Sequence, residues 1–325
     1  MRSRSFGIGL LSVALLAALP AAAQDKPEEV LSAVVGVQAK IQADAHSAAT
    51  LGRQRQGSGA LIREGLVLTI GYLVIEAEAI EVTGSDGRTV PATLAGYDHA
   101  TGFGLLKLAA PLAGKPLPLG DSAALAENDQ AIMASAAGNP ALVEVVSRRE
   151  FTGNWEYLLD SAIFTSPPVP DWSGAVLIGR KAELLGIGSL VVQDAHSPGA
   201  HSPGNMFVPV DLLKPILEDL IAKGRRSGPA RPWLGVNAQA LMGRLFIARV
   251  SPGGPAERAG LKSGDILLAV GDEEVTTLAD FYRKLWRRGA AGVDVPLKVL
   301  QGMQVKDVSV RSIDRVEYFR PSKTY

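Results

Sequence analysis

Short apolar runs separated by turn signals occupy most of the first two thirds of the chain. Segments such as 34–37 (VVGV), 59–62 (GALI) and 80–83 (IEVT) are β-branched or alternate between apolar and polar positions. This pattern indicates strands. Further strands are predicted over 104–108, 130–134, 142–147, 174–178 and 184–189. No long helical pattern separates them, so an antiparallel barrel or sandwich is favoured over a parallel α/β sheet.

A helical period appears only towards the C-terminus. A first helix is predicted over 210–223, ended by Gly224 in a left-handed conformation. After a linker at 225–228, a longer helix begins at Thr277, with Asp280 as its capping-box partner and apolar residues on one face of 278–286. This last part of the chain also carries a short helix at 256–259 and strands at 244–250, 266–270, 293–300 and 305–310. These pieces predict a small β-barrel flanked by two helices.

The N-terminus has the pattern of a targeting segment. Arg2 and Arg4 precede an apolar run over 6–19, and the run is followed by small residues up to Ala23. A charged start, an apolar stretch too short to span a membrane and an Ala-x-Ala end are typical of a secretory signal. We expect residues 1–23 to be a signal peptide, with an uncleaved anchor as the alternative. Export across the inner membrane would place the protein in the periplasm of a Gram-negative organism.

Composition excludes several function classes. The 325 residues suggest two or three domains, and 33 basic residues balance 33 acidic ones, so no basic field exists to hold nucleic acid. The chain has no Cys, which excludes a disulfide framework, a cysteine nucleophile and a thiolate metal site. Of the four His residues, His196 and His201 lie in a tandem Ala-His-Ser-Pro-Gly repeat without a carboxylate cluster nearby. We interpret this repeat as a surface loop and predict no metal and no cofactor.

Twelve short motifs follow one another in an order that is more specific than any of them alone. They are 57–59 (GSG), 68–69 (LT), 82–83 (VT), 85–88 (SDGR), 97–98 (YD), 106–108 (LKL), 119–122 (LGDS), 138–140 (GNP), 173–174 (SG), 204–209 (GNMFVP), 233–236 (WLGV) and 251–265 (SPGGPAERAGLKSGD). With these motifs, the chain resembles the HtrA (DegP-like) family of envelope serine proteases. The resemblance implies a mainly β fold, with a trypsin-like double antiparallel β-barrel over 28–224, a linker at 225–228, a PDZ domain over 229–315 and a C-terminal tail at 316–325.

The resemblance also assigns the positions of a Ser-His-Asp triad. A serine becomes nucleophilic when an imidazole takes its proton and a buried carboxylate orients that imidazole. The motifs place Tyr72 at the position of the family's histidine, Gly102 at that of its aspartate, and Ser173 at that of its serine. Asp171 stands where the family has the glycine whose N–H helps to form the oxyanion hole. These replacements predict a pseudoprotease.

The PDZ motifs are better preserved. The run Trp233-Leu234-Gly235-Val236 resembles the loop that holds a peptide's terminal carboxylate, and 237–241 would be the strand edge that pairs with the peptide. The apolar residues of the following helix are expected to line the pocket for the last side chain; these are Leu278, Phe281, Tyr282 and Leu285. We therefore expect the partners to be C-termini or unfolded segments of envelope proteins. The role would be that of an adaptor, a holdase or a protease regulator.

Two alternatives remain open from the sequence. One is an active serine endopeptidase of envelope protein quality control, in which Ser173 uses a non-standard base such as His99. The other is a barrel that serves only as a scaffold and an oligomerisation piece. Family members often trimerise through aromatic residues near the N-terminus, but residues 24–56 contain no Phe, Tyr or Trp. The family's trimer is therefore not inferred from the resemblance, and a homo-oligomer stays an open alternative.

Overall fold

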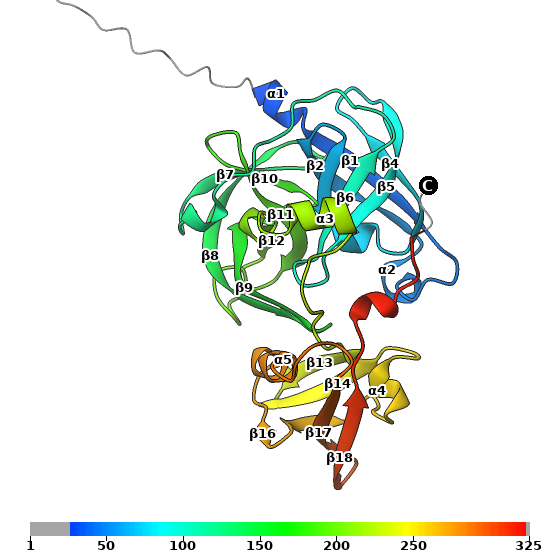
Figure 1. Ribbon diagram of the computed structural model, residues 1–325. Helices are drawn as coiled ribbons and strands as arrows, with labels where there is room; N and C mark the ends of the chain where they lie inside the picture. The colour runs from blue at the N-terminus through cyan, green and yellow to red at the C-terminus, as the bar shows by residue number, and fades with distance from the viewer. Residues whose placement is uncertain (1–26, 323–325) are drawn as a thin grey trace, which may run out of the picture.

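The computed structural model of the protein describes residues 27–322 and consists of two closed barrels followed by a smaller mixed domain (Figure 1). The first barrel has the strand order β1-β2-β3-β6-β5-β4, and β4 closes it by pairing with β1. Its strands are β1 (Val34–Ile41), β2 (Gln54–Arg63), β3 (Leu66–Ile70), β4 (Ala77–Thr83), β5 (Thr89–Tyr97) and β6 (Phe103–Leu108). Every pair is antiparallel, as the alternation of apolar and polar positions predicts.

The second barrel repeats this six-stranded plan. Its strand order is β10-β11-β12-β9-β8-β7. The strands are β7 (Gln130–Ala134), β8 (Ala141–Gly153), β9 (Tyr157–Ser166), β10 (Val176–Ile178), β11 (Leu184–Val192) and β12 (Gly204–Pro209). Met133, Ile163 and Phe207 are completely enclosed in its interior. Because each barrel closes on itself, neither leaves an unpaired strand edge.

Short helical segments precede, connect or follow the strands of the two barrels. They are α1 (Pro27–Leu31), α2 (Ala48–Leu51), η1 (Gly71–Leu73), η2 (Ser122–Ala124), η3 (Val210–Leu212) and α3 (Leu217–Lys223). The prediction of one helix over 210–223 is wrong in its first half, where η3 and a turn precede α3. Pro215 lies in that turn, and a proline interrupts helical hydrogen bonding. The predicted cap is confirmed, because Gly224 ends α3 with φ of 72°.

The C-terminal domain is a six-stranded sheet with two helices. Its elements are β13 (Val236–Leu241), β14 (Arg244–Val250), α4 (Pro255–Arg258), β15 (Ile266–Val270), β16 (Glu273–Glu274), α5 (Leu278–Trp286), β17 (Asp294–Gln301), β18 (Gln304–Arg311) and η4 (Arg315–Glu317). The Thr277 side chain accepts a hydrogen bond from the Asp280 N–H, so the predicted helix start is confirmed. Within residues 27–322, no helix is long and apolar enough to cross a membrane. The predicted signal peptide, residues 1–23, lies outside the described residues.

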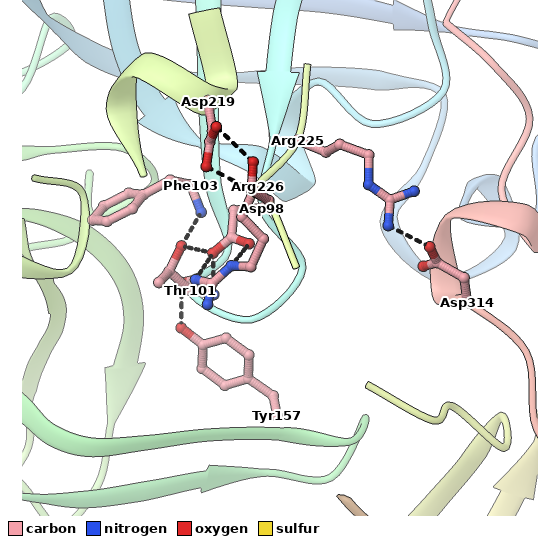
Figure 2. A network of polar contacts seen from close by, with 9 residues as sticks. Asp98, Thr101, Phe103, Tyr157, Asp219, Arg225, Arg226 and Asp314 are labelled. Atoms are coloured by element: carbon pink, nitrogen blue, oxygen red, sulfur yellow. Dashed lines mark hydrogen bonds and ion pairs between the residues drawn. The ribbon is translucent and has the colours of Figure 1, made fainter. Parts of the chain in front are cut away.

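The segment that joins the barrels to the C-terminal domain is anchored by ion pairs. The guanidinium of Arg226 binds both carboxylate oxygens of Asp98 at 2.6 Å each, and Thr101 donates to the same carboxylate (Figure 2). On the other side, Arg225 binds Asp314 at 2.6 Å. The sequence predicted residues 225–228 only as a linker. Side-chain pairs between positions more than 80 residues apart leave no local pattern by which to predict them.

The chain then returns to the first barrel. The Gln42 amide donates to the Pro321 carbonyl at 2.7 Å, and the Arg320 N–H donates to the Glu76 carboxylate at 2.9 Å. The ring of Tyr318 lies 4.2 Å from that of His46. Residues 315–322, which we call the return segment, are therefore packed against the barrel. The sequence had predicted only a tail over 316–325.

Candidate functional site

Ser173 lies in the turn that leads into β10, between the two barrels. Its carbonyl accepts a hydrogen bond from the Ser58 N–H at 2.8 Å, which joins this turn to the first barrel. The next residue, Gly174, has φ of 70°, and a Cβ atom there would lie 2.0 Å from the Ser58 carbonyl oxygen. Only glycine fits this approach. The serine turn is therefore held in a conformation set by backbone contacts on both sides.

Tyr72 is the hydrogen-bond partner of that serine. It lies in η1, directly after β3, and its Oη is 2.6 Å from Ser173 Oγ. The Tyr72 hydroxyl also donates to the Ser189 carbonyl at 2.9 Å. A phenol has one proton, so while that proton points at Ser189 the serine hydroxyl must be the donor to Tyr72. Burial raises the pKa of Tyr72 to about 12, which keeps the phenol protonated.

The position assigned to the aspartate carries no carboxylate. Gly102 has φ of 81°, and its carbonyl accepts from the Gly71 N–H at 2.7 Å. A Cβ atom at Gly102 would lie 3.6 Å from the hydroxyl oxygen of Tyr157. The nearest aspartate in sequence, Asp98, is occupied by Thr101 and Arg226 (Figure 2).

Among the residues 27–322 that the structure describes, no histidine nitrogen makes a hydrogen bond to Ser173. The ring of His99 packs against those of Tyr97 and Phe319, at centroid distances of 4.4 and 5.6 Å. Its Nδ1 is buried without a partner. Burial, together with the nearby positive charges of Arg315 and Arg225, lowers the pKa of His99 well below its usual value.

The remaining polar residues predicted near the site make no hydrogen bond to Ser173 in the described part of the chain. The side chain of Asp171 is exposed, two residues before the serine. His196 and His201 lie in the loop between β11 and β12. In the described part of the chain, no group of three or more His, Asp or Glu side chains is arranged to hold a metal ion.

A cavity of about 520 Å³ lies over Ser173. The barrels contribute Tyr72, Trp172 and Ser173 to its lining, among other residues. The C-terminal domain and the return segment also contribute to the lining, through Trp233, Tyr318 and Phe319 among others. The return segment therefore lines the same cavity as Ser173, which is itself half-buried.

The loop predicted to bind a carboxylate does hold one, and it comes from the second barrel. The N–H groups of Gly235 and Val236 donate to Glu156 Oε1 at 2.7 and 2.9 Å. The N–H of Leu234 donates to Oε2 of the same carboxylate at 3.0 Å. Burial raises the pKa of Glu156 to about 7, although these donors and the charge of Arg315 favour the ionised form. Glu156 was not among the predicted site residues.

The predicted groove residues divide between the core and the contact with the barrel. Phe281 and Leu285 are fully enclosed in the apolar core of the C-terminal domain, and Leu278 is half-buried beside it. Tyr282 is also buried, but its hydroxyl donates to the Gly153 carbonyl at 2.7 Å and accepts from the Glu156 N–H at 3.1 Å. Trp233 is buried, and its ring lies 4.8 Å from that of Tyr318.

Two domain families match the chain. The trypsin-like peptidase domain matches residues 57–187, and the PDZ domain matches residues 246–301. Among curated proteins, the "Probable periplasmic serine endoprotease DegP-like" of Halomonas elongata is 29% identical over 280 residues, which are 79% of this chain and 56% of that protein. The "Serine protease Do-like HtrA" of Bacillus subtilis is 26% identical over 281 residues, 75% of this chain and 60% of that one. The chain thus spans little more than half the length of these relatives.

Solved structures agree on the fold. The structure titled "HtrA-type protease AlgW with decapeptide" matches with a TM-score of 0.53 and 20% identity, covering 90% of this chain and 97% of that chain. The structure titled "HtrA-type protease AlgWS227A with tripeptide" matches with a TM-score of 0.52 and 22% identity, covering 90% and 96%. At these identities the likeness concerns the fold alone.

Proposed function

This chain is an HtrA/DegP-like family protein, mainly β, with a trypsin-like double barrel followed by a PDZ domain, and we propose that it acts without hydrolysing peptide bonds. Its PDZ domain would bind C-terminal or unfolded peptide segments. The protein would then serve as an adaptor, a holdase or a regulator of an active protease.

One observation carries the non-catalytic part of this proposal: the Ser173 hydroxyl is hydrogen-bonded to the hydroxyl of Tyr72, with 2.6 Å between the two oxygens. Acyl transfer needs a group that removes the serine proton near neutral pH. A protonated phenol cannot do so, because the pKa of Tyr72 is raised to about 12. Loss of triad members costs several powers of ten in rate.

The position of the return segment supports the same proposal. Tyr318 and Phe319 of the return segment line the same cavity as Ser173 and Trp172. Arg320 and Pro321 are hydrogen-bonded to the first barrel, which holds the segment in place. We propose that the segment narrows the access of an unfolded chain to the serine.

The backbone N–H groups of Leu234, Gly235 and Val236 support the peptide-binding part. They converge on one carboxylate, which is the arrangement that PDZ domains use to hold a peptide C-terminus. Two solved structures of similar fold are named as HtrA-type proteases with a decapeptide or a tripeptide, which supports such a role. Two curated relatives are named periplasmic proteins, and we propose the same compartment for this chain.

The alternative is an active endopeptidase that uses Ser173 with a non-standard base. Ser173 itself is retained, and the curated relatives are named as serine proteases. Two histidines, His46 and His99, line the cavity that contains Ser173. For either ring to act as the base, it would have to leave its present aromatic neighbours and approach the serine.

Two assays on the protein lacking residues 1–23 test the proposal. In the first, β-casein is incubated with the protein and with its Ser173→Ala variant, and we expect identical, uncleaved casein in both. In the second, a pool of fluorescein-labelled decapeptides with free C-termini is titrated, with the C-terminally amidated pool as control. Casein cleavage that is lost in Ser173→Ala would contradict the first part. Equal binding of free and amidated peptides, or no binding, would contradict the second.

A further inference from the structure

The carboxylate held by the PDZ loop belongs to the tip of the β8–β9 hairpin. In Figure 1 this hairpin reaches from the second barrel towards α5 and β13. Asn154, Trp155 and Glu156 form the loop between the two strands, whose last pair is Gly153 with Tyr157. Glu156 is only 5% exposed, and both of its carboxylate oxygens accept hydrogen bonds from the PDZ loop. A side chain therefore occupies the position where a peptide terminus would bind.

The same hairpin also supplies an apolar anchor. Leu158, two residues after Glu156, is 7% exposed. It does not belong to the core of its own barrel but to the apolar cluster of the PDZ domain, with Leu234, Phe281 and Leu285. A PDZ ligand places its last side chain in an apolar pocket beside the carboxylate loop. Leu158 thus takes the place of that side chain.

Backbone and charge contacts complete the docking. The Ala238 N–H of β13 donates to the Asn154 carbonyl at 3.1 Å, which uses the strand edge where a peptide would pair. On α5, the Arg283 guanidinium binds Glu150 and Asp160 of the two hairpin strands at 2.5 and 2.9 Å. The hairpin therefore makes all three kinds of contact that a PDZ ligand makes: the carboxylate, the apolar side chain and the strand edge.

The conformation of Glu156 is unfavourable for the hairpin alone. Its φ is 57°, in the left-handed region. In a three-residue hairpin loop this position is normally glycine or asparagine, because other side chains are strained there. Such strain persists where surrounding contacts impose it. Here those contacts are the N–H groups of the PDZ loop and the hydroxyl of Tyr282.

We propose that residues 153–158 are a built-in ligand of the PDZ groove, and that a C-terminal peptide binds only by displacing them. This inference rests on the proposed function, since it concerns the site at which peptides would bind. The competitor is part of the same chain, so its effective concentration is high and it lowers the apparent affinity of any peptide. The contacts also define the ligand class, a free C-terminus whose last residue is apolar and similar in size to leucine.

The test compares four versions of the protein lacking residues 1–23. Glu156→Gln removes the charge but keeps the size of the side chain, and Glu156→Gly also removes the strain of the turn. Glu144→Gln is the matched control, because Glu144 is exposed on β8 and is paired with Ser166 within the barrel. The probe is a fluorescein-labelled decapeptide pool with C-terminal leucine, titrated by anisotropy, together with its amidated counterpart.

We expect both Glu156 variants to bind the free-acid pool about tenfold more tightly than the wild type. The NH2 group of Gln would face the N–H donors of the PDZ loop as another donor, and Gly has no side chain to offer them. Glu144→Gln should bind as the wild type does, and the amidated pool should bind weakly to all. Equal affinity of the wild type and both Glu156 variants would overturn the inference while leaving peptide binding itself intact.

Hydrogen exchange separates the inference from the proposed function. Without peptide, the amides of Leu234, Gly235 and Val236 should exchange slowly in the wild type and at least about tenfold faster in Glu156→Gly. If no protein binds the peptides, the peptide-binding proposal fails and this exchange measurement alone decides whether the hairpin occupies the loop. Unchanged exchange in Glu156→Gly would show that it does not.

Discussion

At the residue scale, the proposal of a non-catalytic protein rests on the hydrogen bonds of Tyr72. Its Oη contacts both Ser173 Oγ and the Ser189 carbonyl, at 2.6 and 2.9 Å. The proton of the phenol is directed to the carbonyl. The phenol oxygen can therefore accept a hydrogen bond from the serine hydroxyl, but it does not remove the serine proton. Removal of that proton would need a base whose pKa lies near the working pH. Burial moves the pKa of Tyr72 in the opposite direction, to about 12.

The turn that carries Ser173 gives a prediction about stability. Gly174→Ala would place a Cβ atom 2.0 Å from the Ser58 carbonyl oxygen and 2.7 Å from Thr69 Oγ1. We expect it to lower the free energy of unfolding by at least about 3 kcal/mol, measured by denaturant titration. The matched control is Gly65→Ala, at φ of 69° with nothing within 4 Å, which should cost only about 1 kcal/mol. Equal effects of the two changes would show that the close approach at Gly174 does not constrain the turn.

Sequence motifs could place some site residues but not others. The motif order placed Tyr72 and Ser173 at corresponding positions of a shared fold, and the structure brings these residues, 101 positions apart, to 2.6 Å. Glu156 could not be found in this way, because no pattern shows that its carboxylate meets a loop 78–80 residues away. The one available signal was a glutamate in a hairpin loop where a glycine would fit better.

At the scale of elements, the β8–β9 hairpin is where the sequence prediction was least complete. A strand over 142–147 was predicted, whereas β8 runs over Ala141–Gly153, and β9 was not predicted at all. The second half of β8 was missed because the prediction relied on alternating apolar positions, and residues 148–150 are all charged. In the structure Arg148 donates to the Ser122 carbonyl and Arg149 to the Asp194 carbonyl. Both side chains are therefore accommodated in a strand by contacts that are distant in sequence.

Docking of this hairpin should depend on pH. Burial raises the pKa of Glu156 from 4.5 to about 7, against the effect of its amide donors and of Arg315 on η4. The hydroxyl of Tyr282 on α5 faces the same residue. A group with a raised pKa in the folded protein binds protons more tightly there, so its contribution to stability falls as pH rises from about 4.5 to about 7.

The wild type should therefore gain stability relative to Glu156→Gln when the pH is lowered from 8 to 5.5. The measurement is the difference in free energy of unfolding between the two proteins at each pH. Taking this difference cancels the titration of other groups, including His99. A difference that is constant over this range, or that shrinks at pH 5.5, would contradict the raised pKa of Glu156.

At the scale of the whole molecule, contacts between distant parts of the described chain join the linker, the PDZ domain and the return segment to the barrels. They include the ion pair of Arg226 with Asp98, the β8–β9 hairpin in the PDZ groove, and the return segment on the first barrel. The domain order followed from motifs along the sequence. The way in which the domains contact one another did not, because each connection depends on residues that are far apart in the chain.

Arg226→Ala tests the first of these connections. Asp98 is 2% exposed, and removal of its cation leaves a buried carboxylate whose remaining hydrogen-bond donor, among residues 27–322, is Thr101. We expect a loss of about 2 kcal/mol in the free energy of unfolding. Arg225→Ala is the matched control, since its ion pair with Asp314 is more exposed and should contribute less than about 1 kcal/mol. If thermal and chemical unfolding rank the two variants equally, the buried pair is not a main link between the domains.

The most direct test of the whole account is covalent labelling of Ser173 by a fluorophosphonate probe, which reacts with serines that have an activated hydroxyl. The protein lacking residues 1–23 is incubated at neutral pH beside trypsin as positive control, and labelling is read by intact-protein mass spectrometry. We predict no labelling above that of the Ser173→Ala variant, because the partner of the hydroxyl is the protonated phenol of Tyr72. One probe per molecule, lost in Ser173→Ala, would contradict the account and identify the protein as an active serine hydrolase.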